Sequence, residues 1–166
     1  MPAFKAGDAF PADVSFGYIA PTPETSDVLA CGMPSKYDAS KDFADKKVVL
    51  VAVPGAFTPT CQNQHITGFL SKLKDIKAKG VDKVIVIAYN DPFVMAAWGK
   101  ANGITDDSIL FMSDDGPAFS ESMGWTLGPR TARYAMIIDH GKVVYAEKEP
   151  GKDVGVSGAD AVIAKL

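Results

Sequence analysis

The longest apolar stretches of the chain are short runs that are rich in β-branched residues. Residues 48–53 read Val-Val-Leu-Val-Ala-Val and residues 84–88 read Val-Ile-Val-Ile-Ala, without a polar position. Runs of this length and composition are typical of strands that are buried on both faces of a sheet. Three further strands are predicted at residues 109–112, 133–138 and 142–146, and the last two should form a hairpin around an Asp-His-Gly turn.

Apolar residues recur at three- and four-residue steps after the first strand, and the stripe consists of Ile66, Phe69, Leu70, Leu73 and Ile76. This spacing predicts an amphipathic helix over residues 59–79, which Gly80 should end. Shorter helices are predicted within residues 93–102, 114–123 and 158–166. Strands that alternate with helices before a late hairpin predict an α/β fold with a central mixed β-sheet flanked by helices.

The N-terminal part of the chain is more irregular. Residues 1–20 alternate loosely between apolar and polar positions around turn residues, which predicts a short hairpin at an edge of the sheet. Residues 20–42 are rich in Pro, Ser, Thr and Asp and should form a loop that carries Cys31. Because no repeat or linker divides the chain, residues 1–166 are expected to form a single domain.

Composition narrows the possible functions. A net charge of −3 argues against nucleic acid or an anionic membrane as a partner, and no apolar run is long enough to span a bilayer. Two cysteines and two histidines, without metal-ligand spacing, predict neither a disulfide scaffold, nor a metal site, nor a bound cofactor. The N-terminus lacks the apolar stretch of a signal peptide, so synthesis in the reducing cytoplasm is expected. Cysteines there are more often catalytic or redox-active than structural.

The last three residues, Ala164-Lys165-Leu166, resemble the Ser-Lys-Leu peroxisomal address with one small residue in place of another. The alternative is a helix that happens to end in Lys-Leu. The tripeptide alone does not distinguish a peroxisomal address from a chance helix end. The predicted location is therefore cytoplasmic, peroxisomal or both.

Cys61 is the strongest candidate for chemistry. A Pro/Gly turn follows residues 48–53, Thr58 can then cap a helix, and Pro59 suits the first helical position. Cys61 would lie in the first turn, where unpaired N–H groups and the helix dipole favour the reactive thiolate. The alternative is a buried structural cysteine, which the Thr-Pro pair directly upstream makes the weaker interpretation.

A thiolate site also needs a cation. Arg133 stands at the start of a predicted strand, which can aim a permanently charged guanidinium rigidly, and Arg130 is its rival. Thr58 offers a hydroxyl three residues before the thiol, and Pro54 can shield the sulfur from water. These groups suit a small substrate with two adjacent oxygens, one attacked by sulfur and the other leaving as an anion.

The motif Pro54-x-x-x-Thr58-x-x-Cys61 resembles the active-site signature of the peroxiredoxins. Residues 53–69, 81–98 and 133–141 are similar to the type-5 branch of that family. The position of Cys31 and the C-terminal tripeptide are similar to a fungal and yeast alkyl hydroperoxide reductase subgroup.

The resemblance implies a thioredoxin-like fold with an N-terminal extension and reduction of hydrogen peroxide and alkyl hydroperoxides. It implies that Cys61 is the peroxidatic cysteine, that Thr58 and Pro54 are its hydroxyl partner and shield, and that Arg133 is the family arginine. The sulfur would pass through a sulfenic acid. His65, four residues after the thiol, could form a Cys–His dyad, but we expect it to flank the pocket without acting as a base.

No cysteine follows Cys61, so the resemblance leaves Cys31 as the candidate resolving cysteine. It implies attack across a homodimer and recycling by thioredoxin. The alternative is that Cys31 is idle and that glutathione or another external thiol resolves Cys61. A disulfide exchanger is disfavoured because there is no CxxC motif. A redox sensor or thiol holdase stays open as a non-catalytic alternative.

Overall fold

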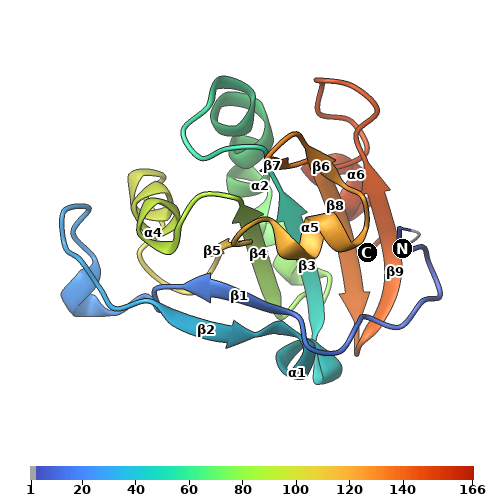
Figure 1. Cartoon of the computed structure of the whole chain (residues 1–166), viewed down its shortest axis with the longest axis horizontal. Helices are drawn as coiled ribbons and strands as arrows, with labels where there is room; N and C mark the ends of the chain where they lie inside the picture. Colours follow the sequence, from blue (N-terminus) through green and yellow to red (C-terminus); the bar gives the residue numbers. More distant parts are fainter. Residues whose placement is uncertain (1–2) are drawn as a thin grey trace.

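The computed structural model describes residues 3–166 and has one large sheet at its centre (Figure 1). The strand order is β2-β1-β5-β4-β3-β8-β9, where β3, β4 and β5 run parallel to one another and the other pairs are antiparallel. The predicted mixed sheet is therefore confirmed. Its strands are β1 (Ser15–Tyr18), β2 (Ser35–Asp38), β3 (Lys47–Ala52), β4 (Lys83–Ala88), β5 (Leu110–Ser113), β8 (Tyr134–Asp139) and β9 (Lys142–Lys148).

Short helices connect the strands, and a small ribbon of two strands precedes β8. The ribbon was not predicted and consists of β6 (Thr126–Leu127) and β7 (Arg130–Thr131). The helices are η1 (Pro23–Thr25), α1 (Ala39–Asp42), η2 (Phe43–Asp45), η3 (Cys61–Ile66), α2 (Thr67–Ser71), α3 (Leu73–Ala78), α4 (Pro92–Ala101), α5 (Ala118–Ser122) and α6 (Ala159–Ile163). Helix α4 begins at the cap Asp91, whose carboxylate accepts a hydrogen bond from the Val94 N–H at 3.0 Å.

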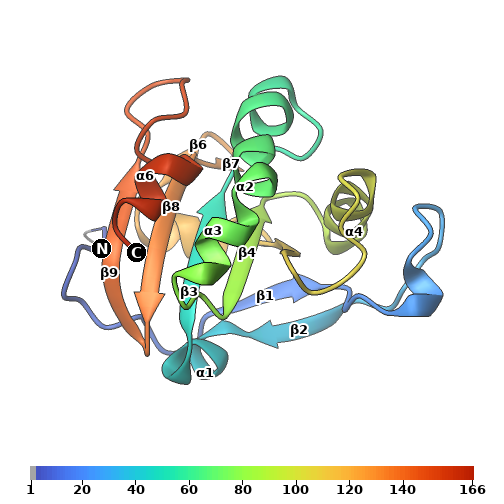
Figure 2. The ribbon, with the colours of Figure 1, turned by 180° about the vertical axis from the view of Figure 1, so that it is seen from behind.

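The apolar runs fill both faces of the sheet. In β3, Val49 and Val51 belong to one core cluster, whereas Val48 and Leu50 belong to the other. Helices α2, α3, α4 and α6 pack on the first face, and Figure 2 shows α2, α3 and α6 in front of the central strands. Helix α5 and the N-terminal segment cover the second face. Burial on both faces explains why these strands lack polar positions.

The predicted helix over residues 59–79 is wrong in its continuity. It begins at Pro59 but passes into a π-helical segment at η3 and is interrupted at Lys72, between α2 and α3. A stripe at steps of three and four residues does not distinguish these arrangements, because each keeps the apolar side chains on the sheet. Gly80 ends the helical region with a φ of +82°, as predicted.

The predicted hairpin within residues 1–20 is also wrong. Residues 1 and 2 lie outside the described residues, and β1 pairs with β2 and with β5 instead of with an earlier strand. The hairpin extension at the edge of the sheet therefore consists of β1 and β2, which are joined by residues 19–34. This connecting loop carries Cys31.

None of the helices within residues 3–166 is long and apolar enough to cross a membrane. The same residues contain no cluster of three or more His, Cys, Asp or Glu side chains suited to a metal ion.

Candidate active site

The pairing of β3 with β8 brings together two segments that are far apart in the sequence. The strands are antiparallel, and Ala52 at the end of β3 lies opposite Tyr134 at the start of β8. Cys61 follows β3 and Arg133 precedes β8, so the sheet places both at the same edge. Arg133 Nη2 lies 3.3 Å from Cys61 Sγ and donates a hydrogen bond to it.

The four residues of the predicted site line one open pocket of about 570 Å³. They are Pro54, Thr58, Cys61 and Arg133. Cys61 lies at its base with only 1% of its surface exposed, whereas the walls include the apolar side chains of Leu127 and Ala132. A small polar substrate can therefore meet the sulfur in surroundings that exclude most of the solvent.

The loop between β3 and the helix is fixed by contacts of its own backbone. Ala56 N donates to Asn90 Oδ1 at 2.8 Å, and Phe57 adopts a left-handed φ of +61°. The Thr58 hydroxyl donates to Gly55 O at 2.7 Å, while its backbone carbonyl accepts from the Gln62 N–H at 2.8 Å. Thr58 thus precedes the helix as predicted, but its side chain closes the loop instead of accepting from the helix.

Arg133 is a buried cation, with 9% of its surface exposed. Its Nη1 lies 3.0 Å from His65 Nδ1 and its Nη2 faces the sulfur. Within residues 3–166 no carboxylate forms an ion pair with it. A buried charge without a counter-ion is unfavourable, so Arg133 favours negative charge on the groups that it contacts.

His65 holds the guanidinium in place. Its Nε2 lies 2.8 Å from Ser157 O, which can only accept, so Nε2 carries the proton and Nδ1 accepts from Arg133. Burial, aided by repulsion from Arg133, lowers the pKa of His65 to about 4, so the ring is neutral under physiological conditions. His65 is fully buried and contacts Arg133 instead of lining the pocket, and this contact was not predicted.

The protonation of His65 should make folding sensitive to acid. An unfolded histidine titrates near pH 6.5, whereas the folded ring stays neutral down to about 4. As the pH falls between these values, the unfolded chain gains a proton that the folded chain does not, so stability is lost. We expect a loss of about 3 kcal/mol through this residue alone.

Urea unfolding at several pH values between about 7 and 4 measures this effect. The variant His65→Gln keeps one donor and one acceptor without a titrating ring, and it should lose less stability on acidification than the wild type. His140→Gln, at an exposed turn position, is the matched control and should behave as the wild type. Equal acid sensitivity of His65→Gln and the wild type would contradict the assignment.

The sequence of this chain is similar to that of known proteins. Residues 5–163 match the family model described as Redoxin. The chain belongs to the Redoxin family. A relative from Lipomyces kononenkoae, named as a peroxisomal peroxiredoxin, is 52% identical over 96% of this chain and 99% of its own.

Solved structures of peroxiredoxins are similar to this chain in fold and in sequence. Reduced Prx3 of Vibrio vulnificus in complex with hydrogen peroxide has a TM-score of 0.82 and 34% identity, covering 97% of this chain and 94% of its own. Peroxiredoxin 5 from Alvinella pompejana has a TM-score of 0.74 and 31% identity, covering 98% and 97%. The predictions of a thioredoxin-like fold and of a thiol peroxidase resembling the type-5 peroxiredoxins are confirmed.

The Redoxin domain contains a further contact network that was not predicted. Gln62, next to the thiol, accepts from the Trp98 Nε1–H at 2.6 Å and donates to Asn102 Oδ1 at 2.6 Å. Trp98 belongs to α4 and Asn102 is its C-terminal cap. These bonds therefore fix the first turn of the helix that begins at Pro59, the active-site helix, to α4. Nothing in the local sequence indicates this pairing, because the partners are 36 and 40 residues away.

Arg130, the rival arginine, does not lie at the thiol. Its guanidinium lies over the ring of Tyr89, 5.5 Å from the ring centroid, on the exposed ribbon of β6 and β7. Arg130 therefore contacts Tyr89, whereas Arg133 reaches the sulfur.

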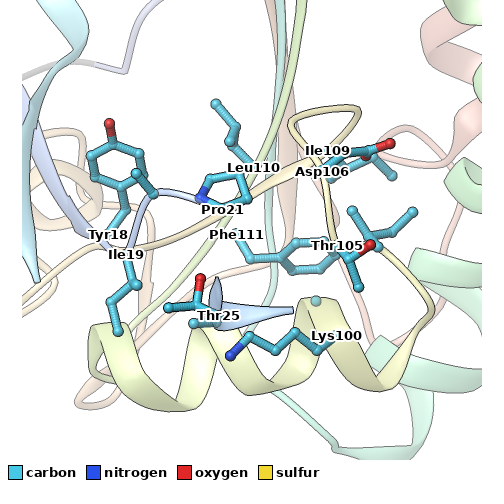
Figure 3. Close-up of a pocket in the computed structure, with 14 residues that line it drawn as sticks. Tyr18, Ile19, Pro21, Thr25, Lys100, Thr105, Asp106, Ile109, Leu110 and Phe111 are labelled. Carbon is cyan, nitrogen blue, oxygen red and sulfur yellow. The ribbon is translucent and has the colours of Figure 1, made fainter. Parts of the chain in front are cut away.

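Cys31 is exposed and lies in the loop at residues 19–34. Lys100 Nζ of α4 donates to Asp27 O at 3.1 Å and to Ala30 O at 2.9 Å, which fixes this loop to the helix. Figure 3 shows the small cavity beneath it, about 40 Å³, between Ile19 on the loop side and Phe111 of β5. Figures 1 and 2 both place the loop at the α4 end of the molecule, away from the start of the active-site helix.

Proposed function

We propose that Cys61 is the peroxidatic residue of this thiol peroxidase. The observation that carries the proposal is the 3.3 Å contact between Arg133 Nη2 and Cys61 Sγ at the base of a pocket. The thiolate attacks the terminal oxygen of a hydroperoxide, an S–O bond forms and the O–O bond breaks. Cys61 is oxidised to a sulfenic acid, and the departing oxygen takes up a proton and leaves as water or an alcohol.

The neighbouring residues supply what this displacement needs. Negative charge moves from sulfur to the departing oxygen, and the guanidinium of Arg133 can stabilise it at both positions. The Thr58 hydroxyl donates to Gly55 O, which leaves its own lone pairs free to accept a hydrogen bond from the peroxide. Pro54 forms part of the pocket wall and keeps water from the sulfur.

Cys31 of a partner subunit is proposed to resolve the sulfenic acid, with thioredoxin reducing the resulting disulfide. A disulfide requires Cα atoms within about 7 Å of each other, and Figures 1 and 2 place the Cys31 loop beyond α4, away from the start of the helix that follows β3. This placement supports attack between subunits of a homodimer over attack within one chain. Reduction of Cys61 by glutathione, with Cys31 idle, is the competing proposal, and the attachment of the loop to Lys100 favours it.

The variant Cys31→Ser tests both proposals. Peroxide treatment of the wild type should give a linked dimer on a non-reducing gel, and the variant should give none. The variant should instead accumulate a sulfenic acid at Cys61, trapped by dimedone and located by mass spectrometry. A linked dimer in the variant would refute the resolving role, and the absence of a dimedone adduct at Cys61 would refute the role of Cys61.

A peroxisomal location is proposed for part of the protein. The Lipomyces kononenkoae relative supports it, and so does the exposure of Ala164 and Lys165 beyond α6. A fluorescent protein fused to the N-terminus should give punctate peroxisomal signal, and removal of the last three residues should leave only the cytoplasmic signal. An identical cytoplasmic distribution of both fusions would contradict a peroxisomal address.

A further inference from the structure

Glu149 is one of the residues that line the active-site pocket, but its carboxylate has no role in the displacement described above. Glu149 follows β9, and its backbone N–H donates to Arg133 O at 2.9 Å. Its Oε1 accepts three hydrogen bonds from the loop after β9: from Gly155 N at 2.7 Å, Ser157 N at 2.7 Å and Ser157 Oγ at 2.8 Å. One carboxylate oxygen thus sets the conformation of that loop.

The loop presents a single carbonyl to the active site. Ser157 is fully buried, and its carbonyl oxygen accepts from His65 Nε2 at 2.8 Å. Tyr145 provides a second anchor one residue earlier, where its hydroxyl donates to Val156 O. The backbone that leads to the Ser157 carbonyl is therefore held by the side chains of Tyr145 in β9 and of Glu149 directly after it.

The position of this carbonyl is transmitted to the sulfur through two side chains. His65 can accept from Arg133 at Nδ1 only while Nε2 carries the proton, and Ser157 O holds that proton there. Arg133 uses Nη1 for His65 and Nη2 for Cys61, and the planar guanidinium keeps these two directions fixed relative to each other. A shift of the carbonyl would therefore alter the contact at the thiolate.

We infer that Glu149 is a positioning residue for the thiol site, acting through Ser157, His65 and Arg133. This inference rests on the proposed roles of Cys61 and Arg133. Its basis is hydrogen-bond geometry and not only negative charge, because Glu149 Oε1 contacts the loop and no contact joins it to the guanidinium within residues 3–166. Other charged residues near the site, Lys148 and Lys152, line the pocket.

Three variants in a Cys31→Ser background separate these effects. Glu149→Ala removes the acceptor, Glu149→Gln keeps one acceptor oxygen without the charge, and Glu147→Ala is the control. Glu147 is an exposed acidic residue of β9, so its removal changes the net charge equally. The readouts are the pH profile of Cys61 alkylation by iodoacetamide, the rate with one equivalent of hydrogen peroxide, and the thermal midpoint.

For Glu149→Ala we expect alkylation at about pH 6 to slow about tenfold, because the thiolate forms at higher pH when Arg133 is misplaced. The peroxide rate should fall about tenfold or more. Glu149→Gln should recover most of both rates, and Glu147→Ala should match the background in both. Should Glu149→Ala fail to fold, Glu149→Asp, which shortens the side chain by one methylene, should show the same shift of the alkylation profile.

An alkylation profile of Glu149→Ala that matches Glu147→Ala would overturn the inference. So would equal impairment of the Gln and Ala variants, because charge and not hydrogen bonding would then be responsible. If Glu149→Asp is used in place of the Ala variant, an unshifted profile has the same meaning. Failure of the proposed function gives a different result: Arg133→Met itself would leave the alkylation profile unchanged.

Discussion

Replacement of Cys61 by serine is expected to lower kcat/KM for hydroperoxides by at least about ten-thousandfold. The serine hydroxyl is not ionised at neutral pH, and its oxygen cannot accept an oxygen atom from a peroxide as sulfur does to form a sulfenic acid. The surrounding geometry should survive, because serine is smaller than cysteine and the buried site is enclosed by unchanged side chains. The measurement is peroxide consumption with thioredoxin and its reductase as the electron source.

Cys31→Ser is the matched control for this prediction. It replaces the other cysteine, which is exposed and far from the pocket, so the first reaction with peroxide should proceed at the wild-type rate. Steady-state turnover with thioredoxin should fall only if Cys31 resolves the sulfenic acid. Normal peroxide turnover by Cys61→Ser would remove the basis of the proposed mechanism, whatever the behaviour of the Cys31 variant.

Arg133→Met is expected to slow the reaction with peroxide by about a hundredfold to a thousandfold. Methionine can fill much of the buried volume, but it provides neither the donor to Cys61 nor the donor to His65. The charge that stabilises the departing oxygen is lost with them. Stopped-flow measurement of the first turnover, followed by intrinsic tryptophan fluorescence, isolates this step from reduction by thioredoxin.

Two further variants, Arg130→Met and Arg133→Lys, serve as controls for the Arg133 prediction. Arg130→Met removes the same charge at a residue that lies over Tyr89, and its first-turnover rate should stay within about threefold of the wild type. Arg133→Lys retains the charge, but a single ammonium does not reproduce the planar fork that serves two acceptors, so it should rescue only part of the rate. A larger loss for Arg130→Met than for Arg133→Met would reverse the assignment of the two arginines.

The central strands could be predicted from the sequence because they are buried on both faces of the sheet. Runs such as residues 48–53 and 84–88 are wholly apolar and are therefore expected in the interior. All five predicted strands are present. Strand β2 escaped prediction because its residues, Ser35–Asp38, are polar and largely exposed at the edge of the sheet. The sequence therefore predicts a partner for β1 within residues 1–20, whereas its partner is β2.

The part of the site that could be predicted is the part formed by residues close together in the sequence. Pro54, Thr58 and Cys61 lie within eight residues, so a local motif specifies their arrangement. The contact of Arg133 with the thiol depends on the antiparallel pairing of β3 and β8, which no local pattern specifies. The sequence indicates Arg133 only as a cation at the start of a predicted strand, and the family resemblance assigns it to the site. The bond between His65 and Ser157 joins residues 92 positions apart and involves a backbone carbonyl, which carries no sequence signal.

The depth of the reacting sulfur has a consequence for the return half of the cycle. With 1% of its surface exposed, Cys61 admits a peroxide of a few atoms but not the tip of a folded reductase. We therefore expect an oxidised sulfur to move outward before it meets a protein thiol, while the first turns of its helix unwind. The π-helical segment begins at that residue, and the poorer hydrogen bonding of such turns makes it a natural place for the opening to start. The rate at which oxidised Cys61 is reduced would then be limited by local unfolding of its helix and not by the peroxide concentration.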